Sequence, residues 1–182
     1  LLEIHLCSKL SCLFSNTKFP ITLKYLTIGG CPMLEYMAEE FEESACLESI
    51  QFFRSGIKSL PRGLDKLIHL QEIFLRSCSN LVSFEECGLL STSFRAFVVE
   101  GCGNFGALPK CMASITSLRR LVVVNCSADI SFPSEGFPAN LKSLAISNAP
   151  KIYRMLKRGV VPRKRDWNDA ASFSHPYQSF PI

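Results

Sequence analysis

The 182-residue sequence predicts a repeat solenoid of the α/β class, in which short coils of similar sequence stack on one another. Three observations predict it. A pair of apolar residues two positions apart recurs seven times, an apolar residue precedes six of these pairs by three positions, and cysteine follows five of them by three positions. Self-similarity at a fixed period of about 20 to 50 residues is the sequence signature of repeat architectures.

The recurring pairs define a frame with steps of 23 or 24 residues. The first members are Leu2, Leu26, Ile50, Ile73, Phe97, Leu121 and Leu144, and the second members are Ile4, Ile28, Phe52, Leu75, Val99, Val123 and Ile146. Apolar residues at alternate positions predict a short strand at each pair. The period and the frame LxxLxLxx(N/C)xL are those of leucine-rich repeats. We therefore expect a leucine-rich-repeat horseshoe of about seven repeats, with a parallel β-sheet on its concave face and loops and short helical turns on its convex face.

The segments between the strands are of two kinds. Residues 60–70 and 108–118 begin with Leu-Pro and have apolar residues at about helical spacing. Because proline is favoured at the first position of a helix, each predicts a short helix or a single turn. Residues 83–94 and 131–141 carry Gly, Pro and Ser and predict irregular loops.

The third repeat departs from the regular pattern, and an acidic segment precedes it. Ser55 stands where most repeats have cysteine, and Ile57 and Leu60 come one residue early. Six glutamates lie between the second and third strands with no lysine or arginine among them, namely Glu35, Glu39, Glu40, Glu42, Glu43 and Glu48. Two interpretations stay open for them, a solvated convex connection and an acidic docking face.

Cysteine occupies one repeat position five times, at Cys7, Cys31, Cys78, Cys102 and Cys126. We expect these side chains to turn inward, where a small, weakly polar group meets the backbone of the turn. The total of nine cysteines is odd and shows no paired spacing, which argues against a disulfide framework and favours a reducing, intracellular compartment. A zinc site would need four ligands converging on one point, and the stacked positions predict no such site.

The repeat frame predicts two parts. Residues 1–156 are expected to form the solenoid, as a fragment whose N-terminal repeats are missing, and residues 157–182 a basic and aromatic tail or a cap on the last coil. The net charge is +4, of which +5 falls from residue 150 onward (7 basic minus 2 acidic), so the repeats are nearly neutral and predict no nucleic-acid surface. No apolar run has the length of a membrane span. The basic cluster of the tail leaves a nuclear address or an anionic-lipid patch open beside a cytoplasmic location.

The sequence predicts no catalytic, cofactor-binding or metal-binding residue. The stretch GCGNFG at 101–106 matches GxGxxG, but Pro109 follows too closely for the helix that the dinucleotide motif requires. Cys102 and Phe105 within it belong to the repeat frame. The three histidines are far apart, and none has a partner at the spacing of a metal site or a catalytic triad.

The remaining chemistry lies on the predicted concave face. Side chains beside the inward pairs point to solvent there, and several of them are apolar or charged. An apolar patch with a charged rim is typical of a protein-binding site. The residues predicted to bind a protein partner are Phe53, Arg54, Glu72, Phe74, Arg76, Val98, Glu100, Arg119, Arg120, Val122 and Val124.

Two long stretches, SLPRGLDKLIHLQEIFLRSCSNLVSF and ALPKCMASITSLRRLVVVNCSADISFPSEGFPANLKSLAIS, resemble the C-terminal repeats of plant intracellular disease-resistance receptors. These receptors are of the coiled-coil, NB-ARC, leucine-rich-repeat class. The resemblance covers residues 1–156. It implies a module that senses a pathogen effector or a guarded host protein and restrains a nucleotide-driven switch domain. The residues that bind ADP or ATP would then lie upstream, in the parent protein.

Two other classes of repeat protein remain as alternatives. A substrate adaptor of a ubiquitin ligase usually continues from the cysteine into a helical segment, whereas Cys78, Cys102 and Cys126 lead into turns. A receptor ectodomain of plants typically carries the phrase N-x-L-x-G-x-I-P, which is absent. The oligomeric state, the species and the partner are left open by the sequence.

Overall fold

The computed structural model describes residues 1–14, 20–37, 40–41, 46–82, 92–126, 130–131 and 136–147. The strands are β1 (Leu2–His5), β2 (Tyr25–Gly29), β3 (Ser49–Phe53), β4 (Glu72–Arg76), β5 (Ala96–Glu100), β6 (Arg120–Val124) and β7 (Ser143–Ile146). Two short 3-10 helices, η1 (Leu64–Lys66) and η2 (Lys110–Ser114), lie between strands. The predicted tail or cap at 157–182, and most of the two predicted irregular loops, fall outside the described residues.

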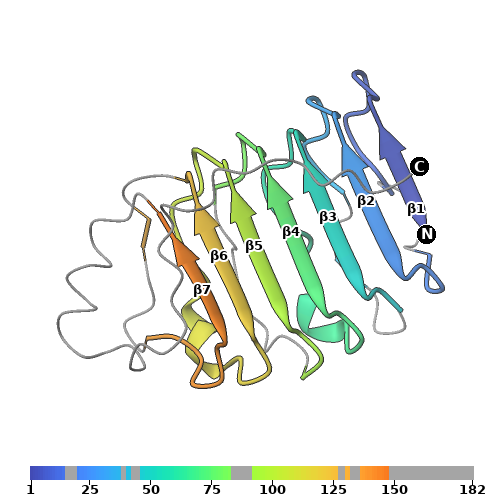
Figure 1. Ribbon diagram of the computed structural model, residues 1–182. Coiled ribbons are helices and arrows are strands. Elements are labelled where there is room, and N and C mark those ends of the chain that lie inside the picture. Colours follow the sequence, from blue (N-terminus) through green and yellow to red (C-terminus); the bar gives the residue numbers. More distant parts are fainter. Residues whose placement is uncertain are drawn as a thin grey trace, which may run out of the picture.

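The seven strands form a single parallel sheet in sequence order, with each strand hydrogen-bonded to the next (Figure 1). The pairing follows the sequence frame. Leu26 pairs with Ile50, Ile50 with Ile73, and so on from Leu2 to Leu144 without a slip. Each strand therefore belongs to one coil of a solenoid, and the predicted repeat, its period and its parallel sheet are confirmed.

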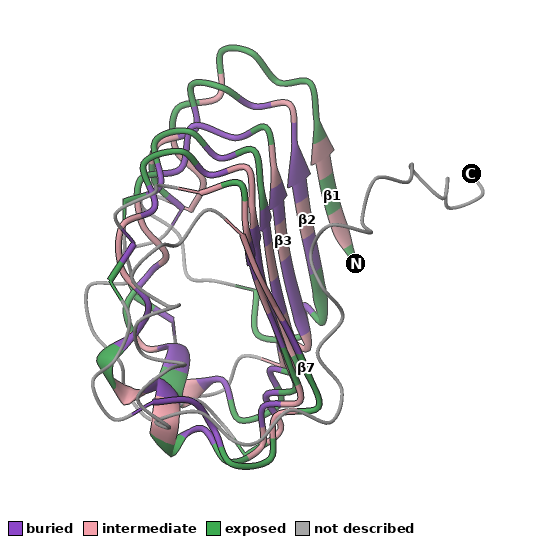
Figure 2. Ribbon diagram, turned by 60° about the vertical axis from the view of Figure 1, so that its left-hand side comes forward, coloured by how far each residue is buried: buried purple, intermediate pink, exposed green. Residues whose placement is uncertain are grey.

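The hydrophobic core fills the space between the sheet and the segments that return from one strand to the next (Figure 2). In the inner coils both frame residues of each strand are buried, as Leu26 and Ile28 show. The apolar residue three positions before the strand joins them, so that Leu47, Leu70 and Phe94 are also buried. Packing between successive coils thus supplies the core that no single coil could form.

The first coil is less buried than those that follow. Leu2 and Ile4 are half-buried, although their counterparts Leu26 and Ile28 are fully buried. Leu6 is 83% exposed, and Cys7 is exposed where Cys31 is buried. A coil with a neighbour on one side only exposes half of its apolar surface, as expected for the end of a stack.

The two Leu-Pro return segments each contain one of the 3-10 helices. The proposed reason for these helices was wrong in detail, because neither proline is the first helical residue. Pro109 precedes η2 as its cap, with a ψ of 135° that lies outside the helical region, and Pro61 lies three residues before η1. Behind the sheet, neighbouring coils are also joined by isolated parallel bridges, Cys12 with Tyr36, Glu40 with Arg62 and Ala107 with Ser131.

A left-handed residue ends six of the strands and turns the chain inward. These residues are Leu6, Gly30, Arg54, Ser77, Gly101 and Asn125, with φ between 49° and 65°. The N–H of each of the first five donates a hydrogen bond to the strand-end carbonyl of the next coil, over 2.7 to 3.0 Å. The sequence frame did not indicate the left-handed conformation of this turn, because only two of the six positions hold glycine.

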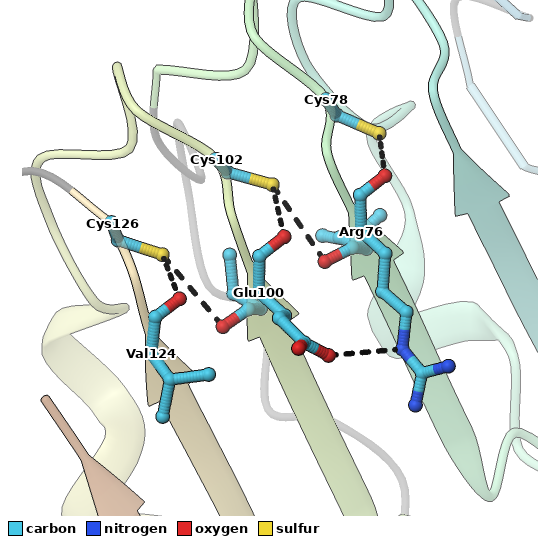
Figure 3. A network of polar contacts seen from close by, with 8 residues as sticks. Arg76, Cys78, Glu100, Cys102, Val124 and Cys126 are labelled. Atoms are coloured by element: carbon cyan, nitrogen blue, oxygen red, sulfur yellow. Dashed lines mark hydrogen bonds and ion pairs between the residues drawn. The ribbon is translucent and has the colours of Figure 1, made fainter. Parts of the chain in front are cut away.

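The cysteine of the frame satisfies the same turn (Figure 3). Each of the five thiols donates a hydrogen bond to the carbonyl two residues earlier, with Sγ to O distances of 3.4 to 3.6 Å. The predicted inward position is confirmed for Cys31, Cys78 and Cys102, which are buried, whereas Cys126 is half-buried and Cys7 is exposed. Burial raises the pKa of Cys126 to about 11, and contact with the Cys78 thiol followed by burial raises the pKa of Cys102. Both thiols therefore keep their protons near neutral pH and act as donors.

Ser55 replaces this cysteine in the third coil and does not take over its role. Its hydroxyl is buried without a hydrogen-bond partner among the described residues. A buried polar group that lacks a partner costs about 1 to 3 kcal/mol. We expect Ser55→Ala and Ser55→Cys each to raise the free energy of unfolding by about 1 kcal/mol, measured by urea denaturation.

Ser49→Ala is the matched control for this prediction. Ser49 is equally buried, but its hydroxyl accepts a hydrogen bond of 3.2 Å from Nε2 of Gln51. Its replacement should lower the free energy of unfolding, because the half-buried amide of Gln51 loses its partner. Equal losses at Ser49 and Ser55 would contradict the unpaired state of the Ser55 hydroxyl.

Candidate protein-binding face

Strand alternation places three rows of side chains on the face of the sheet that is opposite to the core. The first row consists of the first residue of each strand from β2 to β7. These residues are Tyr25, Ser49, Glu72, Ala96, Arg120 and Ser143. The middle row is Glu3, Thr27, Gln51, Phe74, Val98, Val122 and Ala145. The last row is His5, Gly29, Phe53, Arg76, Glu100 and Val124. We call this surface the concave face.

An aromatic cluster lies at the β1 end of the concave face. The ring of Phe53 leans over Gly29 on the neighbouring strand, so closely that a Cβ on Gly29 would lie 2.0 Å from the ring. The His5 ring follows, with its centroid 5.5 Å from that of Phe53. Glycine at position 29 therefore makes the room in which Phe53 lies flat along the sheet.

A cation and an aromatic ring meet at the centre of the face. The guanidinium carbon of Arg76 lies 5.9 Å from the ring centroid of Phe74. Nε of the same guanidinium pairs with a carboxylate oxygen of Glu100 on the next strand, at 3.3 Å (Figure 3). Both charged side chains are about half exposed, so a partner that covered them would meet a preformed, charge-balanced group.

Valines occupy the face beyond this centre. Val122 and Val124 are half-buried, so part of each side chain is accessible to a partner. Val98 is buried, at 1% exposure, although it stands apart from the core cluster. The expectation that Val98 is exposed is therefore wrong. Its in-register neighbours Phe74 and Val122 flank it from both sides, and a sequence pattern does not report such shielding.

The predicted arginines have different positions and contacts. Arg120 begins β6 on the concave face and is exposed, while Arg54 is exposed in the left-handed turn after β3. Nη1 of Arg119 donates to the carbonyls of Thr116, Leu118 and Asn140, over 2.9 to 3.5 Å. Arg119 thus stabilises the turn before β6 and lies at the edge of the concave face, directly before the first residue of the strand.

Sequence reasoning missed Tyr25, an exposed aromatic side chain on the concave face. Its hydroxyl donates a 2.9 Å hydrogen bond to Glu48. Glu48 also accepts from Nζ of Lys24 at 2.8 Å. Tyr25 precedes the frame pair, where the alternation pattern signals only the apolar residues, and its distance from Glu48 in the sequence hides the contact.

The glutamates between β2 and β3 tie neighbouring coils together where the structure describes them. Glu35 pairs with Lys58 at 2.6 Å, Glu40 with Lys66 at 2.6 Å and Glu48 with Lys24 at 2.8 Å. Each lysine comes from an adjacent coil, which explains why the sequence between the strands looked uncompensated. These three contacts favour the connection over the acidic docking face, while Glu39, Glu42 and Glu43 lie outside the described residues.

These pairs predict an acid-dependent loss of stability. The hydrogen bond from Lys66 lowers the pKa of Glu40, and that from Lys24 lowers the pKa of Glu48, from an ordinary value of 4.5. A lowered folded-state pKa gives stabilisation that is present above pH 4.5 and lost as the pH falls through the folded-state pKa. The melting temperature of Glu40→Gln/Glu48→Gln should therefore be below that of the parent at pH 7, with a difference that shrinks as the pH falls below 4.5. Glu3→Gln, on the exposed first strand, is the control and should show no such difference.

Among the residues that the structure describes, no group of three or more His, Cys, Asp or Glu side chains could hold a metal ion. Nor does any helix among the described residues have the length and apolar character that crossing a bilayer needs.

No protein-family model, no curated protein and no solved structure matches this chain.

Proposed function

We propose that this chain is a leucine-rich-repeat solenoid that recognises another protein through its concave face, as part of a plant intracellular immune receptor of the coiled-coil, NB-ARC class. The observation that carries the proposal is the alternation of side chains along each strand. Alternate residues form the core, and the residues between them leave a continuous face of seven strands for a partner. Shielded apolar side chains at the centre with charged side chains around them are what protein interfaces use.

The composition of the concave face supports protein recognition over catalysis. Phe74, Arg76 and Tyr25 belong to the residue types that dominate binding energy at protein interfaces, because they combine large contact areas with directional hydrogen bonds or stacking. Arg76 is held by Phe74 and Glu100, so little of its conformational entropy would be lost on binding. The module itself is proposed to be non-catalytic, and any nucleotide chemistry belongs to a switch domain outside it.

The mechanism we propose has two states. In the resting state the concave face and its edge pack on the switch domain, and an effector or a guarded host protein competes for the same face. An effector shifts such an equilibrium only by its difference in affinity for the two states. Assignment to the immune-receptor class rests on the sequence resemblance. The proposed cytoplasmic location of the protein follows from that class.

The test uses the full gene product, expressed in leaves of a plant that lacks it. The variant Phe74→Ala/Arg76→Glu/Arg120→Glu removes the ring of Phe74 and reverses two positive charges of the concave face. We expect it to lose co-purification with its own switch domain and to cause cell death without an effector. A control with the same charge change on the return segments, Lys9→Glu/Lys110→Glu, should keep the resting state.

Two results would refute the proposal. If the triple variant keeps both partner binding and resting-state restraint, the concave face is not the recognition surface. If the full gene product carries an F-box or a signal peptide in place of a nucleotide-binding domain, recognition belongs to a ubiquitin-ligase adaptor or an ectodomain.

A further inference from the structure

A row of residues precedes the strands and stacks from coil to coil along one edge of the concave face (Figure 1). Backbone hydrogen bonds align its members. The amide of Arg119 donates to the carbonyl of Arg95 at 2.9 Å, and that of Lys142 donates to the carbonyl of Arg119 at 2.8 Å. The row, which we call the rim, consists of Lys24, Glu48, Gln71, Arg95, Arg119 and Lys142.

The two halves of the rim differ in charge. Lys24 and Glu48 form an ion pair, and the neutral Gln71 follows. The other half carries three cations on successive coils, and Arg120 adds a fourth at the start of β6. Among the described residues none of these four forms an ion pair with a carboxylate. Glu72, the acid of the first row, is separated from Arg120 by the whole of strand β5, since both pair with Ala96.

This arrangement is unfavourable for the isolated chain. Neighbouring coils are spaced by about 4.8 Å, so like charges on successive coils repel one another. Elsewhere the chain avoids this, because Lys24, Lys58 and Lys66 each pair with a glutamate of an adjacent coil. A row of cations that lacks carboxylate partners in the described part of the chain therefore favours a ligand that brings negative charge.

Two of the cations are also held in place. Nη1 of Arg95 donates to the carbonyl of Thr92 at 2.6 Å, and Nη1 of Arg119 donates to that of Thr116 at 2.9 Å. One nitrogen of each guanidinium is thus fixed by the turn of its own coil. The described residues provide no partner for the other nitrogens, so a carboxylate could be bound with little loss of side-chain entropy.

The surface beside these cations is apolar and made of small side chains. Ala96, Val98, Val122 and Ala145 continue from the rim across the concave face. A nucleic acid would place its phosphates on the cations, but Ala96, Val122 and Ala145 would offer no hydrogen bonds to its bases. The ligand must therefore carry apolar groups next to its carboxylates.

We propose that the rim from Arg95 to Lys142, with Arg120, binds an acidic segment of a protein partner that carries apolar side chains beside its carboxylates. This inference deepens the proposed function and rests on it, because it names the kind of partner that the concave face accepts. The carboxylates would pair with the four cations, and the apolar side chains would cover Val122 and Ala145.

The test measures binding of the full chain to a fluorescein-labelled 12-residue peptide of alternating glutamate and leucine, by fluorescence anisotropy at two salt concentrations. We expect Arg95→Glu/Lys142→Glu to weaken binding by at least about tenfold, since reversing a charge at an interface loses an attraction and adds a repulsion. The matched control, Lys9→Glu/Lys110→Glu, carries the same charge change at two exposed positions away from the rim and should bind as the parent does. Circular dichroism confirms that each variant is folded.

Further variants and probes decide between this site and other sources of binding. Replacing the basic cluster of the tail, Lys157, Arg158, Arg163, Lys164 and Arg165, by glutamine should leave the affinity unchanged, and binding that follows the tail overturns the proposal. Stronger binding to a DNA oligonucleotide or to vesicles rich in phosphatidylserine than to the peptide also overturns it. If the peptide fails to bind while Phe74→Ala/Arg76→Glu/Arg120→Glu still releases the resting state in leaves, the rim inference fails and the proposed function stands.

Discussion

Replacing Phe52 by alanine is expected to lower the free energy of unfolding by about 4 kcal/mol, one of the largest losses open to a single residue of this fold. Phe52 is 1% exposed and is among the largest fully buried side chains. It lies in register between Ile28 and Leu75, so its removal leaves a cavity at the contact between three coils. Urea denaturation followed by circular dichroism measures the change.

Phe53→Ala is the matched control, since it removes the same atoms one residue further along the strand. Phe53 lies on the concave face and is half-buried, against Gly29 and His5. Its loss is expected to cost about 1 kcal/mol, because part of the ring is in water before the change. If the two variants lost equal stability, the assignment of core and concave faces in β3 would be wrong.

Gly56→Ala is expected to lower the free energy of unfolding by about 3 kcal/mol, at the upper end of the usual cost of overpacking. Gly56 is buried in the turn after β3, where its amide donates to the carbonyl of Cys31 at 3.1 Å. A Cβ at this position would lie 2.0 Å from the carbonyl oxygen of Pro32. Because that neighbour is backbone, the two coils would have to separate to accept the methyl group.

Gly103→Ala provides the comparison for this variant. A Cβ on Gly103 would meet nothing within 4 Å, and its φ is outside the left-handed region. The substitution should therefore be neutral or stabilise by up to about 1 kcal/mol through the unfolded chain. A Gly56→Ala variant as stable as Gly103→Ala would show that neighbouring coils do not approach as closely as described.

The positions that repeat along the chain could be predicted from the sequence almost completely. The spacing of Leu70, Ile73 and Leu75 alone predicts one coil, because every repeat must place apolar residues at these positions to form the core. Cysteine at the turn followed from its recurrence. The parallel order of the strands required no further information, since a stack of equal coils admits only neighbours in sequence order.

Features that depend on the distance between two coils could not be predicted in this way. The ion pair between Glu40 and Lys66 joins residues 26 positions apart. The burial of Val98 depends on its flanking strands, and the bonds from Arg119 to three carbonyls depend on the shape of a turn. A pattern of residue types predicts on which face of the sheet a side chain lies. It does not predict which residues of neighbouring coils that side chain contacts.

Recognition through the concave face is tested most directly by site-specific photo-crosslinking in plant cells. A benzophenone amino acid is placed in the full gene product either at Phe74, at the centre of the concave face, or at Ile68, which is exposed on the return segment behind the sheet. We predict a covalent adduct with a protein partner from position 74 and none from position 68. Equal adducts from both positions, or an adduct from position 68 alone, would contradict recognition by this face.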